Sequence, residues 1–206
     1  LRNKILSNKK KIKDNLIKFK KEKYILIHVK HYSDEVDNLN FANSRQTCDL
    51  KKVFNVINII RKKYKIIILG VKEDKSLKIL KDNLQNKKNI YFFYDLSKNY
   101  SIQDQMFCYY YSLGYIGSAA GMMPILWVLN KKIIVFDLTK DKIDERFISK
   151  NFSFLFKRYL LRKSKKIKIL DENIVEKIRN NNIEKKNLQI LEVSSNEIIK
   201  EFKKFF

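Results

Sequence analysis

Five short runs of isoleucine, valine, leucine and aromatic residues recur through the first two thirds of the chain, and a segment with helical spacing separates each run from the next. The runs are nearly continuous, which is typical of strands that are buried on both faces. Parallel strands require long crossover connections, usually helices, and the intervening segments are long enough for them. We therefore expect parallel strands near residues 24–30, 65–69, 89–94, 114–117 and 132–136.

The segments between these runs predict the helices that cover the sheet. Residues 49–63 carry apolar side chains at the spacing of one buried helical face. Further helices are expected at 74–84, 102–112 and 119–129. Together these elements predict an α/β fold, a Rossmann-like, doubly wound, mostly parallel five-stranded sheet with right-handed connections.

The alternation divides the chain into three parts. We expect residues 1–23 to form a basic helical lead-in or inter-domain link, residues 24–140 the Rossmann-like domain, and residues 141–206 a helical C-terminal extension that packs on it. The extension contains two segments with helical spacing, 171–179 and 196–206. The chain begins with leucine rather than methionine, so we expect it to be part of a longer protein.

The chain is strongly basic, because 45 lysines and arginines against 22 aspartates and glutamates give a formal net charge of +23. Such a charge fits nucleic acid, an anionic membrane surface or a phosphorylated ligand. Recognition of phosphates and bases relies on the planar, bidentate guanidinium of arginine, and the chain has only 7 arginines. We therefore expect no nucleic-acid partner. A non-catalytic basic binding module, for nucleic acid or anionic membrane, is the alternative function.

The sequence lacks the marks of a membrane-spanning, secreted or metal-binding protein. No apolar run approaches the roughly 20 residues that a membrane-spanning helix needs. No secretory signal is visible, so we expect a cytoplasmic protein. Cys48 and Cys108 have no second cysteine or histidine at metal-ligand spacing, and no metal site is expected.

The ligand of such a sheet is expected at one edge. Open parallel sheets bind their ligands outside the carboxyl ends of the strands. This rule selects the segments that follow the predicted strands: 30–45, 70–74, 94–98, 117–121 and 137–140.

The segment 117–121 is the most informative of these, because three of the chain's 4 glycines lie at positions 114, 117 and 121. Small residues at a strand-to-helix junction let backbone N–H groups approach a phosphate closely. We therefore expect Gly117, Ser118 and Gly121 to bind a phosphate group. The alternative is tight packing of strand and helix with no ligand.

Candidate catalytic residues follow the first predicted strand. His28 and Lys30 alternate onto one face of that strand. Histidine titrates near neutral pH, so His28 is a candidate base, and Lys30 is long enough to contact a diphosphate. Asp34 in the following loop is a second candidate base, and Arg45 is placed to bind phosphate in a bidentate manner. For each of them, a core or solvated role is the alternative.

An ordered set of short motifs resembles a family of bacterial surface-polysaccharide glycosyltransferases and, more distantly, the fucosyltransferase-like enzymes of the GT-B type. The motifs, in order, are His28-Val29-Lys30, Ala42-Asn43-Ser44, the strand that ends at Gly70, Tyr115-Ile116-Gly117-Ser118-Ala119-Ala120-Gly121, the stretch 124–135 and Ser194-Ser195-Asn196-Glu197-Ile198. The likeness covers residues 24–137 and, more loosely, 152–206. Lys30 and Ala42 replace arginines of the family, and Ala119 and Ala120 replace hydroxyl residues.

The resemblance implies a GT-B fold, in which two Rossmann-like halves hold a nucleotide-sugar donor in the cleft between them without a bound metal. It implies that this chain is the C-terminal, donor-binding half of a hexosyl- or fucosyl-type glycosyltransferase, and that an acceptor half precedes it. The expected partners are a nucleotide-diphosphate sugar and a glycan or lipid-linked acceptor, with no further cofactor. On this basis four residues join the glycine turn in the donor site: Lys30, Asn43, Ser44 and Arg45.

A basic segment near the C-terminus is the expected contact with a membrane. Aromatic and leucine residues lie beside its cations, which are Arg158, Arg162, Lys163, Lys165 and Lys166. An anionic bilayer attracts such residues, and the attraction weakens with salt. We expect a peripheral location on the inner face of the membrane, where a lipid-linked acceptor would be found. The alternative is a solvated connector whose aromatic side chains cap the sheet.

Overall fold

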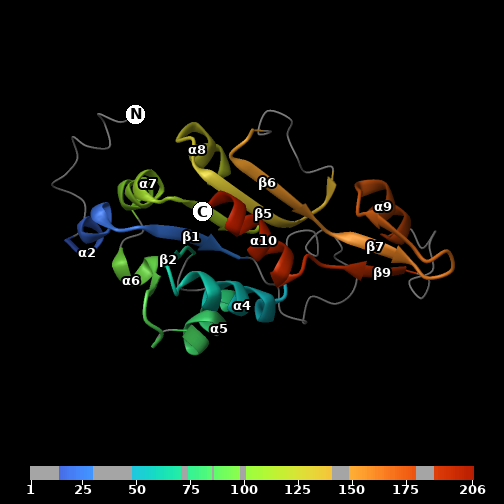
Figure 1. Ribbon diagram of the computed structural model, residues 1–206, viewed down its shortest axis with the longest axis horizontal. Coiled ribbons are helices and arrows are strands. Elements are labelled where there is room, and N and C mark those ends of the chain that lie inside the picture. The colour runs from blue at the N-terminus through green and yellow to red at the C-terminus, as the bar shows by residue number, and fades with distance from the viewer. Residues whose placement is uncertain are drawn as a thin grey trace.

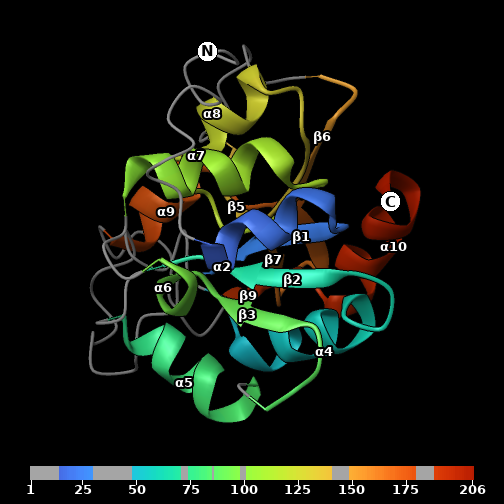
Figure 2. The same ribbon diagram turned by 90° about the vertical axis from the view of Figure 1, so that its left-hand side faces the viewer.

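Six parallel strands form the main sheet, in the spatial order β3-β2-β1-β4-β5-β6 (Figures 1 and 2). The strands are β1 (Tyr24–His28), β2 (Lys65–Ile68), β3 (Ile90–Phe92), β4 (Gly114–Gly117), β5 (Lys132–Leu138) and β6 (Phe152–Phe156). The computed structural model describes residues 14–29, 48–70, 74–84, 86–97, 101–140, 149–179 and 188–206. The five predicted strands and their parallel pairing are confirmed.

Helices cover both faces of this sheet. One face carries α4 (Leu50–Ile60), α5 (Lys75–Leu84) and α10 (Ser195–Phe205). The other face carries α2 (Asp14–Ile17), the 3-10 helix η2 (Lys18–Lys21), α6 (Phe93–Leu96), α7 (Ile102–Tyr111) and α8 (Met123–Val128). Across the described ranges, no helix is long and apolar enough to cross a membrane.

The side chains of β1 alternate between two hydrophobic cores. Ile25 and Ile27 join the core beneath α4, α5 and α10, while Tyr24 and Leu26 join the core beneath α7 and α8. All four are buried, and burial of an aliphatic side chain stabilises the fold by about 1.5–3 kcal/mol. Burial on both faces explains the continuous apolar runs and confirms the doubly wound α/β fold.

The order of the strands reverses at β1. The chain first adds β2 and β3 on one side of β1, and then returns to place β4, β5 and β6 on the other side. The register at the reversal pairs Ile27 with Ile116 and His28 with Gly117. The carboxyl ends of β1 and β4 therefore lie side by side, while α4 and α8, the next described helices, lie on opposite faces.

The C-terminal region contains strands that the sequence did not predict. β6 adds a sixth strand beside β5. Beyond it, β7 (Arg158–Leu161), β8 (Lys166–Ile169) and β9 (Leu188–Leu191) form a small antiparallel sheet in the order β8-β7-β9, next to α9 (Glu172–Arg179). The expectation was five strands followed by a helical extension. The described residues instead contain four further strands, β6 to β9, and α9 and α10 are the helices of the expected extension. The pairing of β7 with β9 spans an intervening helix, so no local pattern announces it.

The helix after β4 also begins later than expected. The sequence predicts a helix over 119–129, whereas α8 begins at Met123 after a turn. Pro124 lies in the first turn of α8, where a proline ring fits because its missing N–H has no helical partner to lose. Residues 119–122 are consequently free to form a turn at the end of β4.

We expect the substitution Gly114→Ala to destabilise the fold. A Cβ at position 114 would lie 2.1 Å from the carbonyl oxygen of Lys132 on the neighbouring strand. Overpacking of this kind costs about 1–3 kcal/mol of unfolding free energy. Gly121→Ala is the matched control, because no described atom lies within 4 Å of a Cβ there. Urea unfolding followed by circular dichroism measures both variants, and equal stabilities would contradict the close packing of β4 against β5.

Candidate functional site

The carboxyl ends of β1 and β4 mark the point where the strand order reverses. Open α/β sheets bind ligands outside the carboxyl ends of the strands at such a point. His28 ends β1, and Gly117 ends β4 directly beside it. The fold thus brings together two segments that the sequence selects separately.

Gly117 is required by the close approach of the two backbones. A Cβ at this position would lie 1.9 Å from the carbonyl oxygen of His28. The same oxygen accepts a hydrogen bond from the Ser118 N–H at 2.9 Å, and the Tyr115 hydroxyl donates to the Ser118 carbonyl oxygen. These contacts fix the start of the next turn against the end of β1.

The turn that follows, residues 119–122, presents backbone donors. Its four N–H groups donate to no partner among the described residues, whereas the Met123 N–H donates to the carbonyl oxygen of Ala120. Gly121 is exposed, and neither a left-handed backbone nor a close neighbour accounts for a glycine there. Successive N–H groups in a turn around an exposed glycine are donors of the kind that an anionic group such as phosphate accepts.

The side chain of Ser118 faces the interior of the protein. It is fully buried, and its hydroxyl forms a hydrogen bond with the side chain of Cys48. Burial, together with the nearby negative charge of Asp137, raises the pKa of the Cys48 thiol to about 12. The thiol is therefore protonated at neutral pH and is a poor nucleophile. The Ser118 hydroxyl is therefore engaged in the interior, beside a thiol that stays protonated.

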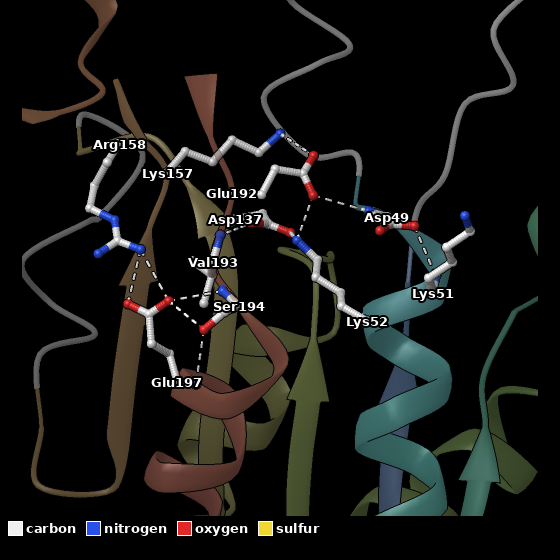
Figure 3. A network of polar contacts seen from close by, with 10 residues as sticks. All are labelled: Asp49, Lys51, Lys52, Asp137, Lys157, Arg158, Glu192, Val193, Ser194 and Glu197. Atoms are coloured by element: carbon white, nitrogen blue, oxygen red, sulfur yellow. Dashed lines mark hydrogen bonds and ion pairs between the residues drawn. The ribbon is translucent and has the colours of Figure 1, made fainter. Parts of the chain in front are cut away.

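A largely buried network of charged side chains lies at the same edge of the sheet (Figure 3). Its charges act on Cys48, so the network is close to that thiol. Lys52 of α4 donates to Asp137 in β5 and, at 2.7 Å, to Glu192 after β9. Lys157, between β6 and β7, lies 3.8 Å from the other Glu192 oxygen. The side chains of Lys52, Asp137 and Lys157 are only 8%, 0% and 3% exposed. Glu192 is 36% exposed, so the two lysines and two carboxylates neutralise one another at the border between the interior and the surface.

Asp137 is held in an uncommon backbone conformation. Its φ is 58°, in the left-handed region, and the pairing of β5 with β6 shifts register between Phe136 and Leu138. Aspartate enters this region more readily than most residues. The Asp137 carboxylate contacts Lys52 of α4 and also accepts a hydrogen bond from the Val193 N–H at 3.0 Å. One buried carboxylate thus ties β5 to α4 and to the segment that enters α10.

Burial and ion pairing act in opposite directions on the pKa values of this network. Burial alone would lower the pKa of Lys52, but its contacts with Asp137 and Glu192 outweigh that effect and raise it. Burial alone would raise the pKa of Glu192, but the contacts with Lys52 and Lys157 lower it. Burial lowers the pKa of Lys157, and its carboxylate neighbours offset this only in part. Lys157 is therefore the lysine of the network that releases its proton more easily.

The arrangement combines a charged network that braces the fold with backbone N–H groups that have no partner among the described residues. Each lysine of the network already faces a carboxylate, so neither offers an uncompensated charge to a ligand. The backbone donors of residues 119–122 do have capacity for one. Within the described residues, no three His, Cys, Asp or Glu side chains are grouped to hold a metal ion. The expectation of a metal-free site stays a prediction.

The described residues include part of the predicted site. Four predicted residues, His28, Gly117, Ser118 and Gly121, lie at the reversal of the strand order, and their contact with a donor stays a prediction. The other donor-site and catalytic candidates lie outside the described residues: Lys30, Asp34, Asn43, Ser44 and Arg45. The predicted basic patch lies on the small sheet, with Arg158 in β7, Arg162, Lys163 and Lys165 in the turn to β8, and Lys166 at the start of β8.

Sequence reasoning missed the buried network, although two of its members carry a signal. Lys52 is a charge within an amphipathic helix, and Asp137 interrupts a strand of isoleucine, valine and phenylalanine. The rule of strand ends selects 137–140 as well. Their partners Glu192 and Lys157 follow strands that the sequence did not predict, and without those strands the four charges cannot be placed together.

Comparison with known proteins gives a likeness among solved structures only. No protein-family model and no curated protein matches the chain. The UDP-GlcNAc 2-epimerase of Methanocaldococcus jannaschii, in complex with UDP-GlcNAc and UDP, is 16% identical with a TM-score of 0.48, over 98% of this chain and 52% of that chain. The ADP-heptose lps heptosyltransferase II of E. coli is 9% identical with a TM-score of 0.48, and the likeness covers 82% of this chain and 52% of that chain. MnaA of S. aureus with UDP is 16% identical with a TM-score of 0.41, and the likeness covers 60% of this chain and 30% of that chain.

This chain spans about a third to a half of the length of those structures. All three TM-scores lie below 0.5, and all three identities are low. A functional assignment therefore depends on the side chains and backbone groups of this chain.

We expect Lys52→Met to destabilise the protein strongly. The substitution keeps an aliphatic side chain of similar length but leaves Asp137 buried without its cation, and breaking a buried ion pair costs about 3–5 kcal/mol. Lys51→Met is the matched control, because Lys51 is exposed on the same helix and such a surface change is worth about 0.5 kcal/mol or less. Urea unfolding compares the two. A Lys52→Met protein as stable as the control would show that the network does not brace the fold.

The network also predicts how stability changes in acid. The lowered pKa of Glu192 stabilises the folded state above the ordinary value of 4.5, and this contribution is lost as the pH falls through the lower pKa of the folded protein. Glu192→Gln removes the titrating group. The stability difference between the wild type and this variant should therefore be larger at neutral pH than well below 4.5. Urea unfolding across this pH range measures it, and a difference independent of pH would be the contrary result.

Proposed function

We propose that this chain is the donor-binding half of a glycosyltransferase of the GT-B type. It binds a nucleotide-diphosphate sugar at the carboxyl ends of β1 and β4, and the sugar is transferred to a glycan or lipid-linked acceptor in surface polysaccharide synthesis. The observation that carries the proposal is the turn 119–122. There, N–H groups without partners among the described residues surround an exposed glycine at the reversal of the strand order.

The diphosphate is the part of the donor that this edge suits. Phosphate oxygens accept hydrogen bonds from N–H groups, and a glycine lets them approach the backbone because no Cβ intervenes. The ion pair of Lys52 with Asp137 holds β5 and α4 beside this edge. A braced edge loses little conformational freedom when a ligand binds, which favours affinity.

In the proposed reaction, an acceptor hydroxyl attacks the sugar carbon, and the bond from that carbon to the diphosphate breaks. The protein assists by positioning the reactants and by stabilising the negative charge that develops on the leaving diphosphate. The N–H groups of the turn and the ammonium group of Lys30 are assigned to that charge. His28 and Asp34 are the candidate bases for the proton of the attacking hydroxyl.

Titration calorimetry of the folded chain with GDP, UDP, dTDP and CDP tests the proposed binding. We expect one of these nucleotides to bind, and Gly121→Val to weaken its binding about tenfold or more. The branched side chain would occupy the space of the phosphate, and a hydrogen bond to a charged group is worth about 1.5–3 kcal/mol. Asn86→Val is the matched control, because Asn86 lies in an exposed turn at the opposite, amino-terminal edge of the sheet.

The unfolding free energy of Gly121→Val separates a binding defect from a folding defect, and it should match that of the wild type. Two results would remove the proposal. One is the absence of binding by all four nucleotides to the folded chain. The other is an unchanged affinity of the Gly121→Val variant for the nucleotide that binds the wild type.

A further inference from the structure

An exposed basic hairpin projects from the small antiparallel sheet. We use the term basic hairpin for residues 158–169, which comprise β7, the turn after it and β8. The eight residues 162–169 are all exposed and contain five cations and no acidic residue. Ile167 and Ile169 are 58% and 44% exposed, whereas the isoleucines of β1 are buried. The basic hairpin therefore combines charge with exposed aliphatic surface.

The two faces of the basic hairpin differ. Tyr159 and Leu161 lie on the face that packs against α9. Residues alternate between faces along a strand, and Ile167 pairs directly with Leu160 of β7. Ile167, Ile169 and Leu160 therefore lie on the face that points away from α9. The result is a short aliphatic ridge, while Lys166 and Lys168 of β8 pair with Leu161 and Tyr159 and so lie on the opposite face. The cations at the end of the ridge are those of the turn, Arg162, Lys163 and Lys165.

The basic hairpin lies at the same edge of the protein as the candidate site. Only Lys157 separates β6 from β7, and β6 is parallel to β5, so β7 extends beyond the carboxyl ends of the main sheet (Figure 1). Lys157 belongs to the buried network, which fixes the base of the hairpin. Arg158, a member of the predicted patch, is held by an ion pair with Glu197 of α10 at 3.0 Å. The exposed cations at the far end are those that face a partner.

We propose that the basic hairpin docks the protein on the surface of an anionic lipid bilayer. Arg162, Lys163 and Lys165 of the turn lie among the headgroups, and Ile167 and Ile169 insert at the boundary with the acyl chains. Basic residues near such a surface and buried aliphatic side chains both favour association. The inference is independent of the proposed nucleotide binding, because the two involve different residues.

Nucleic-acid binding and protection against strand pairing each account for fewer features of the basic hairpin than a bilayer does. Proteins that bind single-stranded nucleic acid use exposed aromatic rings and arginines for stacking and bidentate contacts. The exposed run 162–169 holds one arginine and no aromatic residue. Lysines on an edge strand also prevent unwanted strand pairing, but that role does not require exposed isoleucines. The boundary between headgroups and acyl chains accounts for both the cations of the turn and the exposed isoleucines of β8.

Co-sedimentation of the chain with phosphatidylcholine vesicles, with and without phosphatidylserine, tests the proposal. The chain should bind only vesicles that contain phosphatidylserine, and more weakly as salt increases. The test variant replaces three cations of the turn: Arg162→Ser, Lys163→Ser and Lys165→Ser. The control variant, of equal net charge, replaces three exposed lysines near α4 and α5: Lys62→Ser, Lys63→Ser and Lys78→Ser. The test variant should lower the partition coefficient about a hundredfold, because each cation contributes a factor of about five, and the control should change it little.

A further variant, Ile167→Ser with Ile169→Ser, isolates the aliphatic contribution. It should weaken the binding that persists at high salt, while its unfolding free energy stays close to that of the wild type because both side chains are exposed. Equal losses in the test and control variants would overturn the proposal, since they would reflect the net charge of +23 alone. Binding that ignores phosphatidylserine would overturn it too. Binding of a single-stranded oligonucleotide that the test variant abolishes, with vesicle binding unchanged, would assign the hairpin to nucleic acid instead.

Discussion

The ion pair of Asp137 with Lys52 is the interaction on which the carboxyl edge of the sheet depends. Either charge alone would be costly in the interior, because burial of an unpaired charge is strongly unfavourable. Paired, they join β5 to α4, and the Val193 N–H adds the segment that enters α10. Glu192 and Lys157 extend the same contacts to the base of the basic hairpin. Segments far apart in the sequence are thereby held beside the end of β1.

Two kinds of polar group lie at this edge: charged side chains that are paired with one another, and backbone N–H groups without a partner among the described residues. The charged network is neutral overall, so it stabilises the fold without offering a charge to a ligand. Gly117, at the end of β4, and Gly121, in the turn after it, differ in the same way. Gly117 is explained by the His28 carbonyl oxygen against which it packs, whereas no neighbour among the described residues explains Gly121. The open backbone donors around Gly121 are therefore the groups to which we assign the ligand.

The sequence predicted what local patterns encode. A strand buried on both faces must be apolar at every position, so β1 and β2 were recognisable, and with them the parallel sheet. The meeting of His28 and Gly117 was predicted in part, because both lie at strand ends. The small sheet was not predicted, since β8 reads Lys-Ile-Lys-Ile and is joined to β9 only through β7. The charged network was missed for the same reason, because Glu192 and Lys157 flank those strands.

Hydrogen–deuterium exchange with bound nucleotide tests most directly the claim that a nucleotide diphosphate binds where the strand order reverses. The N–H groups of residues 119–122 have no partner among the described residues, so they should exchange rapidly in the free chain. A saturating concentration of the nucleotide that binds should slow exchange most strongly at these residues and leave the basic hairpin unchanged. Unchanged exchange of residues 119–122 at saturation, with protection confined to another part of the chain, would contradict the claim.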